Sequence, residues 1–391
     1  MLESIYRTSG LRVGLFTSPH LVSFRERIQV NREWISPGEV VRLVSQMQEL
    51  LQRLPSSNHP SFFELVTVLA LRYFAEQRCE LVVWETGLGG RLDATNIVAP
   101  LASVITNIEL DHEQWLGSTL AQIAFEKAGI IKPGVPVLTA TDQPSALDVI
   151  QARAAELSAP CTVVRAADSV APPLDRLALP LLGQHQRINA ALALATVRTL
   201  QALLPVDEAS IRRGLEEVRW PGRLQLERLP DGRSVLLDGA HNPAGAATLR
   251  DALQQLFPGQ KPTLVLGVLR DKDWKTMCRI LVPAAARVVL VPVSSDRTAA
   301  PDELELITRQ IRPGGAVQAC HSLQEGLEAV RHDAFIVITG SLHLIGDAME
   351  SLGLVASADN ERALNEWDAS AAASRPAPAV VLPEPGASTA P

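Results

Sequence analysis

Hydrophobic positions along the chain follow two patterns, which predict strands and helices in alternation. Short continuous apolar runs at Leu81–Trp84 and Ser103–Thr106 are typical of buried strands in a parallel sheet. Residues 61–78 instead carry apolar side chains at helical spacing, and Ser61 and Glu64 form a capping box at the start of that helix. The same patterns predict further helices at residues 1–10, 37–54, 146–157 and 181–200, and further strands at residues 12–17 and 135–139.

The alternation restarts after the segment WPGRLQ at residues 220–225. Strands are expected at residues 235–240, 263–268, 288–293, near 317 and at 335–341, with helices at 244–256, 274–281, 302–311 and 323–330. Strands that alternate with helices form parallel sheets. The sequence therefore predicts an α/β protein with two parallel-sheet domains, at residues 1–222 and 223–355. A disordered tail is expected at residues 356–391, where large apolar residues are scarce.

Composition narrows the class of protein. The chain has 391 residues, enough for two domains, and its net charge of −7 gives no basic surface for nucleic acid. No run reaches about 18 apolar residues, so no membrane-spanning helix is expected. The four cysteines lack paired spacing and are expected to be reduced thiols of a cytoplasmic protein.

Three side chains that could act in catalysis or binding follow the two central strands. Glu85 and His112 lie in the loops after these strands, and Lys127 lies on the next predicted helix. Open α/β sheets bind ligands at the carboxyl ends of their strands. The three groups together favour a site for a divalent cation and phosphates, where a partly buried lysine amine can react with carbon dioxide to form a carbamate. Taken singly, Glu85 could be a helix cap, His112 a structural histidine, and Lys127 a cation at a helix end.

Other polar residues allow two interpretations each. Asp93 could cap the next segment or contact a polar substrate, and Ser341 could be only a helix N-cap. The turn DGAHNPAG presents backbone N–H groups to an anion or a sugar hydroxyl, or else Asp238 and Asn242 only cap the next helix. Asp271 and Lys272 are expected in a charged surface loop. The glycines of ETGLGG do not complete a dinucleotide fingerprint, which argues against a nicotinamide dehydrogenase.

Eight segments in this order resemble the bacterial folylpolyglutamate synthase/dihydrofolate synthase family, over roughly residues 1–352. That family belongs to a superfamily of ATP-dependent amide ligases that includes the muramoyl-peptide ligases. The segments are TSPHLVSFRERI, FFEL, ETGLGGRLDATN, LDHEQWLG, EKAGI, GQHQRINAALAL, WPGRLQ and LDGAHNP.

The resemblance implies an activity and a role for each matching residue. ATP phosphorylates a carboxylate of dihydropteroate or a folate, and the amine of L-glutamate then displaces phosphate. The expected cofactors are ATP and Mg²⁺, and the protein is expected to be a monomer without nucleic-acid or membrane partners.

The implied magnesium ligands are Ser18, Glu85 and His112. The implied catalytic residues are Lys127, as a carbamate, and His241. The implied ATP-binding residues are Asn189, Arg223 and Asp238. The implied pterin-binding residues are Ser61, Phe62, Phe63, Glu64 and Asp93, and Ser341 is expected near the glutamate with His241.

The sequence departs from this family at its start. The family opens with a strand and a glycine-rich phosphate loop, GTNGKGS-like, directly before the helix that begins here as MLESIYRTSG. We expect that the start codon is placed too late, and that residues 1–391 as written turn over near background, because the loop supplies several phosphate donors at once. The alternatives are a non-catalytic remnant that binds folate or nucleotide, and a muramoyl-peptide ligase.

Overall fold

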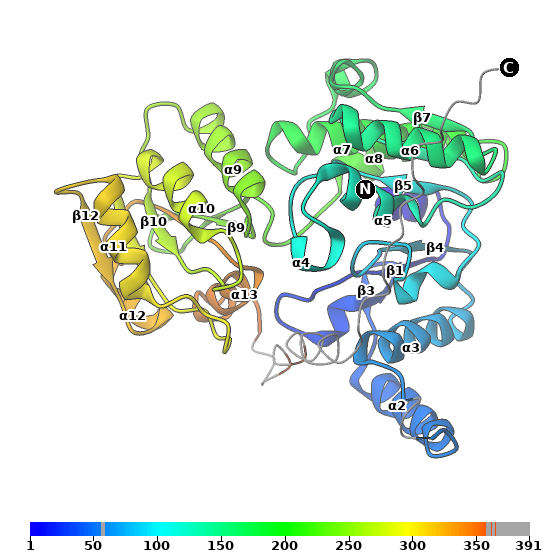
Figure 1. Cartoon of the computed structure of the whole chain (residues 1–391), viewed down its shortest axis with the longest axis horizontal. Coiled ribbons are helices and arrows are strands. Elements are labelled where there is room, and N and C mark those ends of the chain that lie inside the picture. The colour runs from blue at the N-terminus through cyan, green and yellow to red at the C-terminus, as the bar shows by residue number, and fades with distance from the viewer. Residues whose placement is uncertain (56–58, 357–360, 362–363, 365–391) are drawn as a thin grey trace, which may run out of the picture.

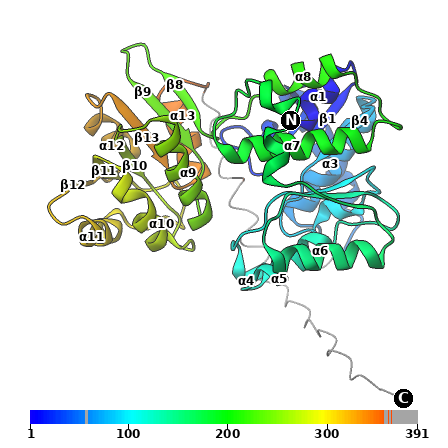
Figure 2. The same ribbon diagram turned by 90° about the horizontal axis from the view of Figure 1, so that it is seen from above.

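The computed structural model describes residues 1–55, 59–356, 361 and 364. Strands and helices alternate in two α/β parts that lie side by side (Figures 1 and 2). This arrangement confirms the predicted fold class. The strands of the first part form two sheets, however, and those of the second part form one.

The first sheet has the strand order β3-β2-β1-β4. Its central strand β1 (Val13–Phe16) pairs in parallel with β4 (Leu81–Trp84) and antiparallel with β2 (Ile28–Val30), which continues antiparallel to β3 (Glu33–Trp34). The second sheet has the parallel order β5-β6-β7. Its strands are β5 (Ser103–Ile105), β6 (Val137–Thr139) and β7 (Cys161–Val163). The sequence did not predict β2, β3 or β7, which are two or three residues long.

Helix α7 holds the two sheets together. One core cluster packs this helix against Val13 of β1, Leu138 of β6 and Ile5 of α1, all of which are buried. The apolar spacing predicted α1, α2, α3, α6 and α7 to within a few residues, whereas the short helices α4 and α8 were missed. The helices of this part are α1 (Leu2–Thr8), α2 (Pro37–Leu51), α3 (Phe62–Glu76), α4 (Glu113–Leu116), α5 (Leu120–Ala128), α6 (Pro144–Glu156), α7 (Gln184–Thr199) and α8 (Glu208–Glu216).

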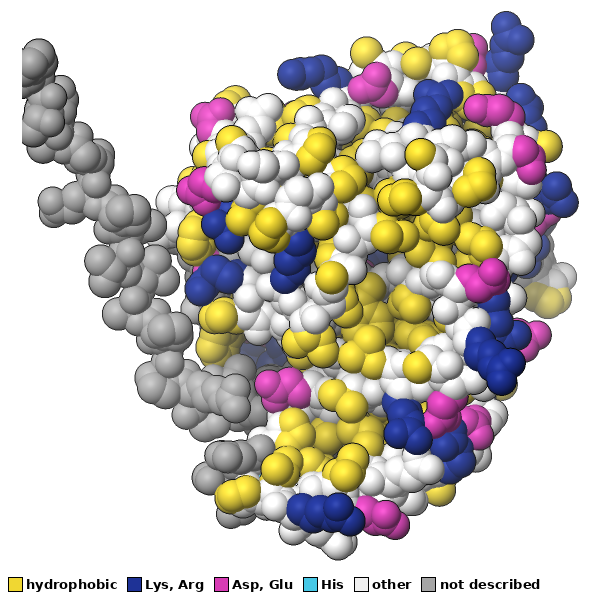
Figure 3. Space-filling model, turned by 90° about the vertical axis from the view of Figure 1, so that its right-hand side faces the viewer, with side chains coloured by type: hydrophobic (Ala, Val, Ile, Leu, Met, Phe, Trp, Pro, Cys, Tyr) yellow, Lys and Arg dark blue, Asp and Glu magenta, His cyan; other side chains and the backbone are white. Residues whose placement is uncertain are grey.

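Strand β4 differs from its prediction. A continuous apolar run predicted a buried strand in a parallel sheet, but all four residues Leu81–Trp84 are only half-buried. In the described part of the chain, β4 is the edge strand of one sheet and β5 the edge strand of the other. Each therefore pairs on one side only. Figure 3 shows the face on the right of Figure 1, where hydrophobic side chains gather toward the middle.

The second part contains one sheet in the order β12-β11-β10-β13-β9-β8. All pairs are parallel except β8–β9, so the predicted parallel sheet carries one additional antiparallel edge strand. Its strands are β8 (Gln225–Arg228), β9 (Ser234–Asp238), β10 (Thr263–Leu266), β11 (Arg287–Leu290), β12 (Ala316–Ala319) and β13 (Phe335–Thr339). Its helices are α9 (Pro243–Leu256), α10 (Trp274–Leu281), α11 (Pro301–Ile311), α12 (Leu323–Ala329) and α13 (Leu342–Ser351).

Three residues of the predicted disordered tail, 356, 361 and 364, are described, and the last two make contacts with the first part. The Glu361 carboxylate accepts hydrogen bonds from the Ser23 hydroxyl at 2.6 Å and the Phe24 amide at 2.7 Å. Leu364 packs against the aromatic cluster next to β1. The expected disorder of residues 356–391 as a whole stays a prediction. The rest of residues 357–391 lies outside the described residues.

A glycine controls how closely α1 and α8 pack, and this can be tested. A Cβ atom at Gly214 would lie 2.5 Å from Cα of Ile5, so Gly214→Ala is expected to force the helices apart and lower the free energy of unfolding by roughly 1–3 kcal/mol. Gly38→Ala is the matched control, because the nearest atom beyond its neighbours lies 4.0 Å away. Alanine's higher helix propensity makes that change neutral or stabilising by up to about 1 kcal/mol. Urea unfolding measures the free energy of unfolding of both variants. Equal changes for Gly214→Ala and Gly38→Ala would contradict the packing argument.

Candidate functional site

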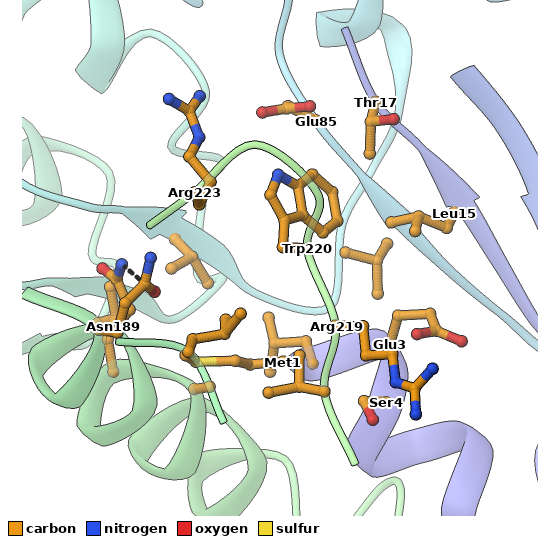
Figure 4. A pocket seen from close by; sticks show the side chains of 18 of the residues that line it. Met1, Glu3, Ser4, Leu15, Thr17, Glu85, Asn189, Arg219, Trp220 and Arg223 are labelled. Atoms are coloured by element: carbon orange, nitrogen blue, oxygen red, sulfur yellow. Dashed lines mark hydrogen bonds between the residues drawn. The ribbon is translucent and has the colours of Figure 1, made fainter. Parts of the chain in front are cut away.

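A cavity of about 1010 Å³ lies in the first part and reaches the segment that leads to the second. Thr17 and Glu85 border it after β1 and β4, Asn189 projects from α7, and Arg223 follows the first part's last helix (Figure 4). The volume is at the upper end of the roughly 300–1,000 Å³ typical of ligand pockets. The cavity is therefore large enough for a nucleotide-sized ligand.

Glu85 stands at the end of β4, where a tight loop holds it. The Ser18 amide donates a hydrogen bond to Oε2 of Glu85 at 2.9 Å. The Glu85 side chain faces the cavity and is exposed there. Protein atoms surround it on its other sides and remove part of its hydration, which raises the pKa of Glu85 to about 7. The Ser18 amide and the charge of Arg223 oppose the rise. Two predicted magnesium ligands thus lie together.

Asp238 ends β9 and is buried. Its Oδ2 accepts the Leu224 amide at 2.9 Å, and its Oδ1 accepts the Ala240 amide at 3.0 Å. Burial raises the pKa of Asp238, and the Leu224 hydrogen bond and the Arg223 charge oppose that rise. Arg223 is therefore close enough to act on both Glu85 and Asp238. The carboxylate holds the turn between the two parts.

Asp111 joins the two parts of the chain. Its Oδ1 accepts a hydrogen bond from Nζ of Lys272 at 2.7 Å, and its Oδ2 accepts one from Nδ2 of Asn242 at 2.9 Å. Nε2 of His241 lies 3.4 Å from the same Oδ2. Burial alone would raise the pKa of Asp111, but the His241 and Lys272 contacts and the charge of His112 outweigh it, so the pKa falls well below its usual range.

His112 and Lys127 lie beside this cluster. Burial lowers the pKa of His112, and the charge of Lys272 adds to the effect while Asp111 opposes it. Burial also lowers the pKa of Lys127, against the charges of Asp111 and Asp93. His112 has φ of 52° and directs its amide to Oδ1 of Asp111 at 2.8 Å, so the residue sits in a left-handed turn that few non-glycine residues adopt.

The glycine-rich loop at residues 85–96 positions the helix that carries Lys127. The Arg91 amide donates to the Glu126 carbonyl at 2.8 Å, and the two side chains form an ion pair at 2.9 Å. A Cβ atom at Gly90 would lie 2.9 Å from the Glu126 carbonyl oxygen and 3.0 Å from that of Lys127. Only glycine permits this approach, so the loop's glycines serve helix packing beside the site.

The predicted pterin-binding residues gather at the start of α3 and in the loop after β4. The Ser61 amide donates to Oε2 of Glu64 at 2.7 Å, and the Ser61 hydroxyl accepts the Glu64 amide at 3.3 Å, which confirms the predicted capping box. Asp93 caps the turn that follows it and accepts the Leu88 amide at 2.7 Å. Some of these polar groups therefore already make hydrogen bonds within their own loop or helix, and their role in binding a pterin stays a prediction.

Phe62 and Phe63 take part in the aromatic core beside this loop. The ring of Phe63 lies 5.9 Å from that of Phe16, and the ring of Phe62 lies 6.2 Å from that of Phe24, measured between centroids. Ser341 is buried and is the N-cap of α13, with its hydroxyl accepting the His343 amide at 3.2 Å. The N-cap interpretation of Ser341 is confirmed, and its place near a glutamate stays a prediction.

The side chains near Glu85 can be tested for whether they fit a bound Mg²⁺ ion. No group of three or more His, Cys, Asp and Glu side chains that could hold a metal occurs among the described residues. Mg²⁺ commonly takes only one or two carboxylates and completes its shell with water and substrate phosphates. Glu85, with Ser18 beside it, fits such an ion. The role of His112 as a third ligand stays a prediction.

The sequence interpretation missed the contacts of Asp111, and it was wrong about Lys272. This lysine was expected in a surface loop, but its side chain is only 11% exposed and paired with Asp111. Asn242 caps α9, which was one of the two interpretations of this turn, and its side-chain amide also donates to Asp111. The sequence did contain a signal for this cluster, namely the acidic, cationic and imidazole residues in the segments LDHEQ, DGAHNP and LRDKDW. Only the fold determines that these three segments lie together.

Ionisation of Glu85 is expected to destabilise the folded protein. Because its pKa is raised from an ordinary 4.5 to about 7, the folded state holds a proton that the unfolded state has already lost. Glu85→Gln should therefore raise the Tm of the metal-free protein, by a margin that grows from pH 4.5 to 7 and stays constant above. Thermal unfolding across pH 4–9 measures this, and a margin independent of pH would contradict it.

Asp111 and Lys272 are expected to be energetically coupled. Asp111→Ala leaves a largely buried ammonium without its partner and should lower the free energy of unfolding by roughly 2 kcal/mol, between the values for exposed and buried pairs. Lys272→Met removes the same ion pair from the other side. Unfolding of both single variants and the double variant gives the coupling, expected at about 1–2 kcal/mol. Strictly additive losses would show that the contact contributes nothing.

Comparison with known proteins identifies the family. Residues 222–342 match the family "Mur ligase, glutamate ligase domain". The dihydrofolate synthase/folylpolyglutamate synthase of Bacillus subtilis is 35% identical over 382 residues, which cover 90% of this chain and 86% of that protein. Folylpolyglutamate synthase from Thermotoga maritima superposes with a TM-score of 0.78 at 34% identity, covering 94% of this chain and 87% of that one.

A second solved structure agrees. The folylpolyglutamate synthase of Mycobacterium tuberculosis, complexed with ADP and AMPPCP, superposes with a TM-score of 0.81 at 30% identity, over 90% of this chain and 87% of that chain. Similarity of this extent covers both α/β parts, and it confirms the resemblance that the eight sequence segments predicted. The chain belongs to the dihydrofolate synthase/folylpolyglutamate synthase family of ATP-dependent ligases.

Proposed function

We propose that this protein is an ATP-dependent amide ligase that joins L-glutamate to dihydropteroate and to folates. The observation that carries the proposal is the row of polar groups that runs from Glu85 through Arg223, Asp238 and His241 to Asp111. This row crosses from one α/β part to the other. A reaction that brings a nucleotide, an acid and an amine together needs groups from both parts at one place.

The chemistry proceeds in two steps. ATP transfers its γ-phosphoryl group to a carboxylate oxygen of the pterin substrate, which gives an acyl phosphate and ADP. The glutamate amine then attacks the acyl carbon, the C–N bond forms, the C–O bond to phosphate breaks, and the amine gives up a proton. We propose that Asn189, Arg223 and Asp238 hold the nucleotide, and that Arg223 faces the phosphates from the cavity wall.

The residues near Asp111 suit the second step. Nδ1 of His241 lies 2.8 Å from the Gly239 carbonyl, which leaves Nε2 on the side of Asp111. We propose that this Nε2 takes the amine proton and that Asp111 stabilises the resulting imidazolium. Ser341 is proposed to contact the incoming glutamate. Lys272 supplies a positive charge at the same place.

Ser18, Glu85 and His112 are the proposed ligands of Mg²⁺, which when bound supplies charge compensation for the phosphates. Lys127 is the proposed site of carbamate formation, because burial lowers its pKa and so favours the neutral amine that reacts with carbon dioxide. Ser61, Phe62, Phe63, Glu64 and Asp93 are the proposed pterin site.

We further propose a division into residues 1–222 and 223–355, a cytoplasmic monomer, and no nucleic-acid or membrane partner. Cys79, Cys161, Cys278 and Cys320 are free thiols, which agrees with a reducing compartment. No described helix is both long and apolar enough to cross a membrane.

A single-turnover assay tests the function. Protein in excess over dihydropteroate is mixed with ATP, Mg²⁺ and glutamate, and mass spectrometry follows dihydrofolate, so that even slow turnover is measured. Product is expected only with all components. Because turnover near background is expected for residues 1–391 as written, the single-turnover rate should be slow, and Lys127→Ala and His241→Ala should each lower it to the rate without enzyme. Lys261→Ala, in an exposed loop, is the matched control and should leave the rate unchanged.

Two other outcomes would contradict the proposal. Dihydropteroate binding without any ATP-dependent product would favour a binding protein without ligase activity. Ligation of an amino acid to a muramoyl peptide, in preference to dihydropteroate in a competition assay, would assign the chain to the muramoyl-peptide ligases.

A further inference from the structure

After its last helix the chain returns from the second part to the first. Leu354 and Val355 pack against the core cluster of the second part that includes α13. Glu361 then contacts the loop after β1, at residues 20–24. The six steps from Val355 to Glu361 span at most about 20 Å when fully extended. While Glu361 stays in place, the second part therefore cannot move far from this loop.

Glu361 accepts hydrogen bonds from three donors of this loop. Its Oε2 accepts the Ser23 hydroxyl at 2.6 Å and the Phe24 amide at 2.7 Å. Its backbone carbonyl accepts Nε2 of His20 at 3.0 Å. The residues that supply these donors are all buried. Buried donors need acceptors, and an ionised acceptor makes a stronger hydrogen bond than a neutral one. Glu361 is therefore specifically recognised by the loop.

The carboxylate of Glu26 gives the receiving loop its shape. It accepts the amides of residues 21–23 at distances of 2.8, 2.8 and 2.7 Å. The Phe24 amide comes next along the chain, and it donates to Glu361 instead. The loop thus satisfies three amides internally and presents the following one to the C-terminal segment.

Leu364 makes a second contact of a different kind. It packs against the aromatic cluster next to β1, and Phe62 packs against the same cluster. Glu361 and Leu364 are three residues apart. The segment therefore presents a carboxylate and an apolar side chain at a fixed spacing, to a loop of donors and an apolar surface.

His20 connects the docked segment to the proposed pterin site. Nε of Arg27 donates to Nδ1 of His20 at 3.0 Å. Because arginine can only donate, Nδ1 is an acceptor and the ring proton is on Nε2, which donates to Glu361. The Arg27 guanidinium lies over the ring of Phe62, 5.7 Å from its centroid. A continuous chain of contacts thus leads from Glu361 to Phe62.

We propose that the C-terminal segment of this chain is a strap, which docks on the loop after β1 through Glu361 and Leu364. Docking orients Arg27 through its contact with the imidazole, and thereby holds Phe62 in position for the pterin. The recognition elements are a carboxylate and, three residues later, a leucine. The coupling to the pterin rests on the function proposed above, whereas the docking does not.

Trypsin digestion of the full chain tests the docking, because Arg362 lies between the two anchoring residues in the sequence. Mass spectrometry at early times gives the rate of cleavage after Arg362. Each rate is compared with that of a free peptide of residues 356–368 with the same substitutions, which corrects for their effect on trypsin itself. The native protein should be cleaved about tenfold more slowly than its peptide, or slower still, since docking makes a charge-assisted hydrogen bond.

The variant that removes both anchors is Glu361→Ala/Leu364→Ser, and it should be cleaved as fast as its peptide. Its matched control is Glu49→Ala/Leu203→Ser, which changes the same residue types at exposed positions and should keep the protection. Equal protection in the variant and the native protein overturns the docking.

Calorimetric titration with dihydropteroate tests the coupling separately. The variant without anchors should bind about fivefold more weakly than the native protein and the control, because Phe62 loses a positioned cation–π partner. The native peptide of residues 356–368, added at about millimolar concentration to match a tethered segment, should restore the affinity. The same peptide with both anchors substituted should not, which separates docking from a general loss of structure.

Unchanged dihydropteroate affinity in a variant that has lost its protection from trypsin overturns the coupling. If the native protein itself binds no dihydropteroate, the pterin site of the proposed function is wrong and the coupling fails with it. Digestion needs no substrate and decides the docking alone, so the two failures are distinguishable.

Discussion

Asp111 is the contact on which the arrangement of the site depends. A carboxylate that is only 21% exposed must be hydrogen-bonded or paired, and its partners Lys272, Asn242 and His241 all come from the other α/β part. The position of His241 relative to His112 thus follows from the requirement to satisfy one negative charge. Any movement of one α/β part relative to the other must either keep the Asp111 carboxylate paired or expose it to water.

Three carboxylates of the site have different surroundings: Glu85 directly after β4, Asp111 in the loop that follows β5, and Asp238 at the end of β9. Glu85 and Asp238 are desolvated with few compensating donors, so the pKa of each is raised. Asp111 is also desolvated, but a lysine and a histidine outweigh that effect, and its pKa is lowered. Glu85 can therefore hold a proton near neutral pH, whereas Asp111 stays an anion that orients Lys272 and Asn242.

Local features of the chain were predictable because their partners are close in sequence. Ser61 and Glu64 are three residues apart, and the capping box needs nothing beyond that spacing. The N-caps at Ser341 and Asn242 are of the same kind. Lys272 lies 161 residues from Asp111, and no local pattern distinguishes it from a lysine on a surface loop. The family motifs point to the site residues, but which of them touch is a property of tertiary packing.

Strand β4 shows a different limit of sequence interpretation. Its apolar run correctly predicts a strand with Glu85 at its end, but periodicity carries no information about which strand pairs with which edge. Neighbours in sequence, β4 and β5, lie in separate sheets, and α7 rather than a ladder of hydrogen bonds holds them in register. Packing of one helix on two sheets is less directional than strand pairing. The relative position of Glu85 and His112 consequently depends on side-chain packing around α7, which no local sequence pattern predicts.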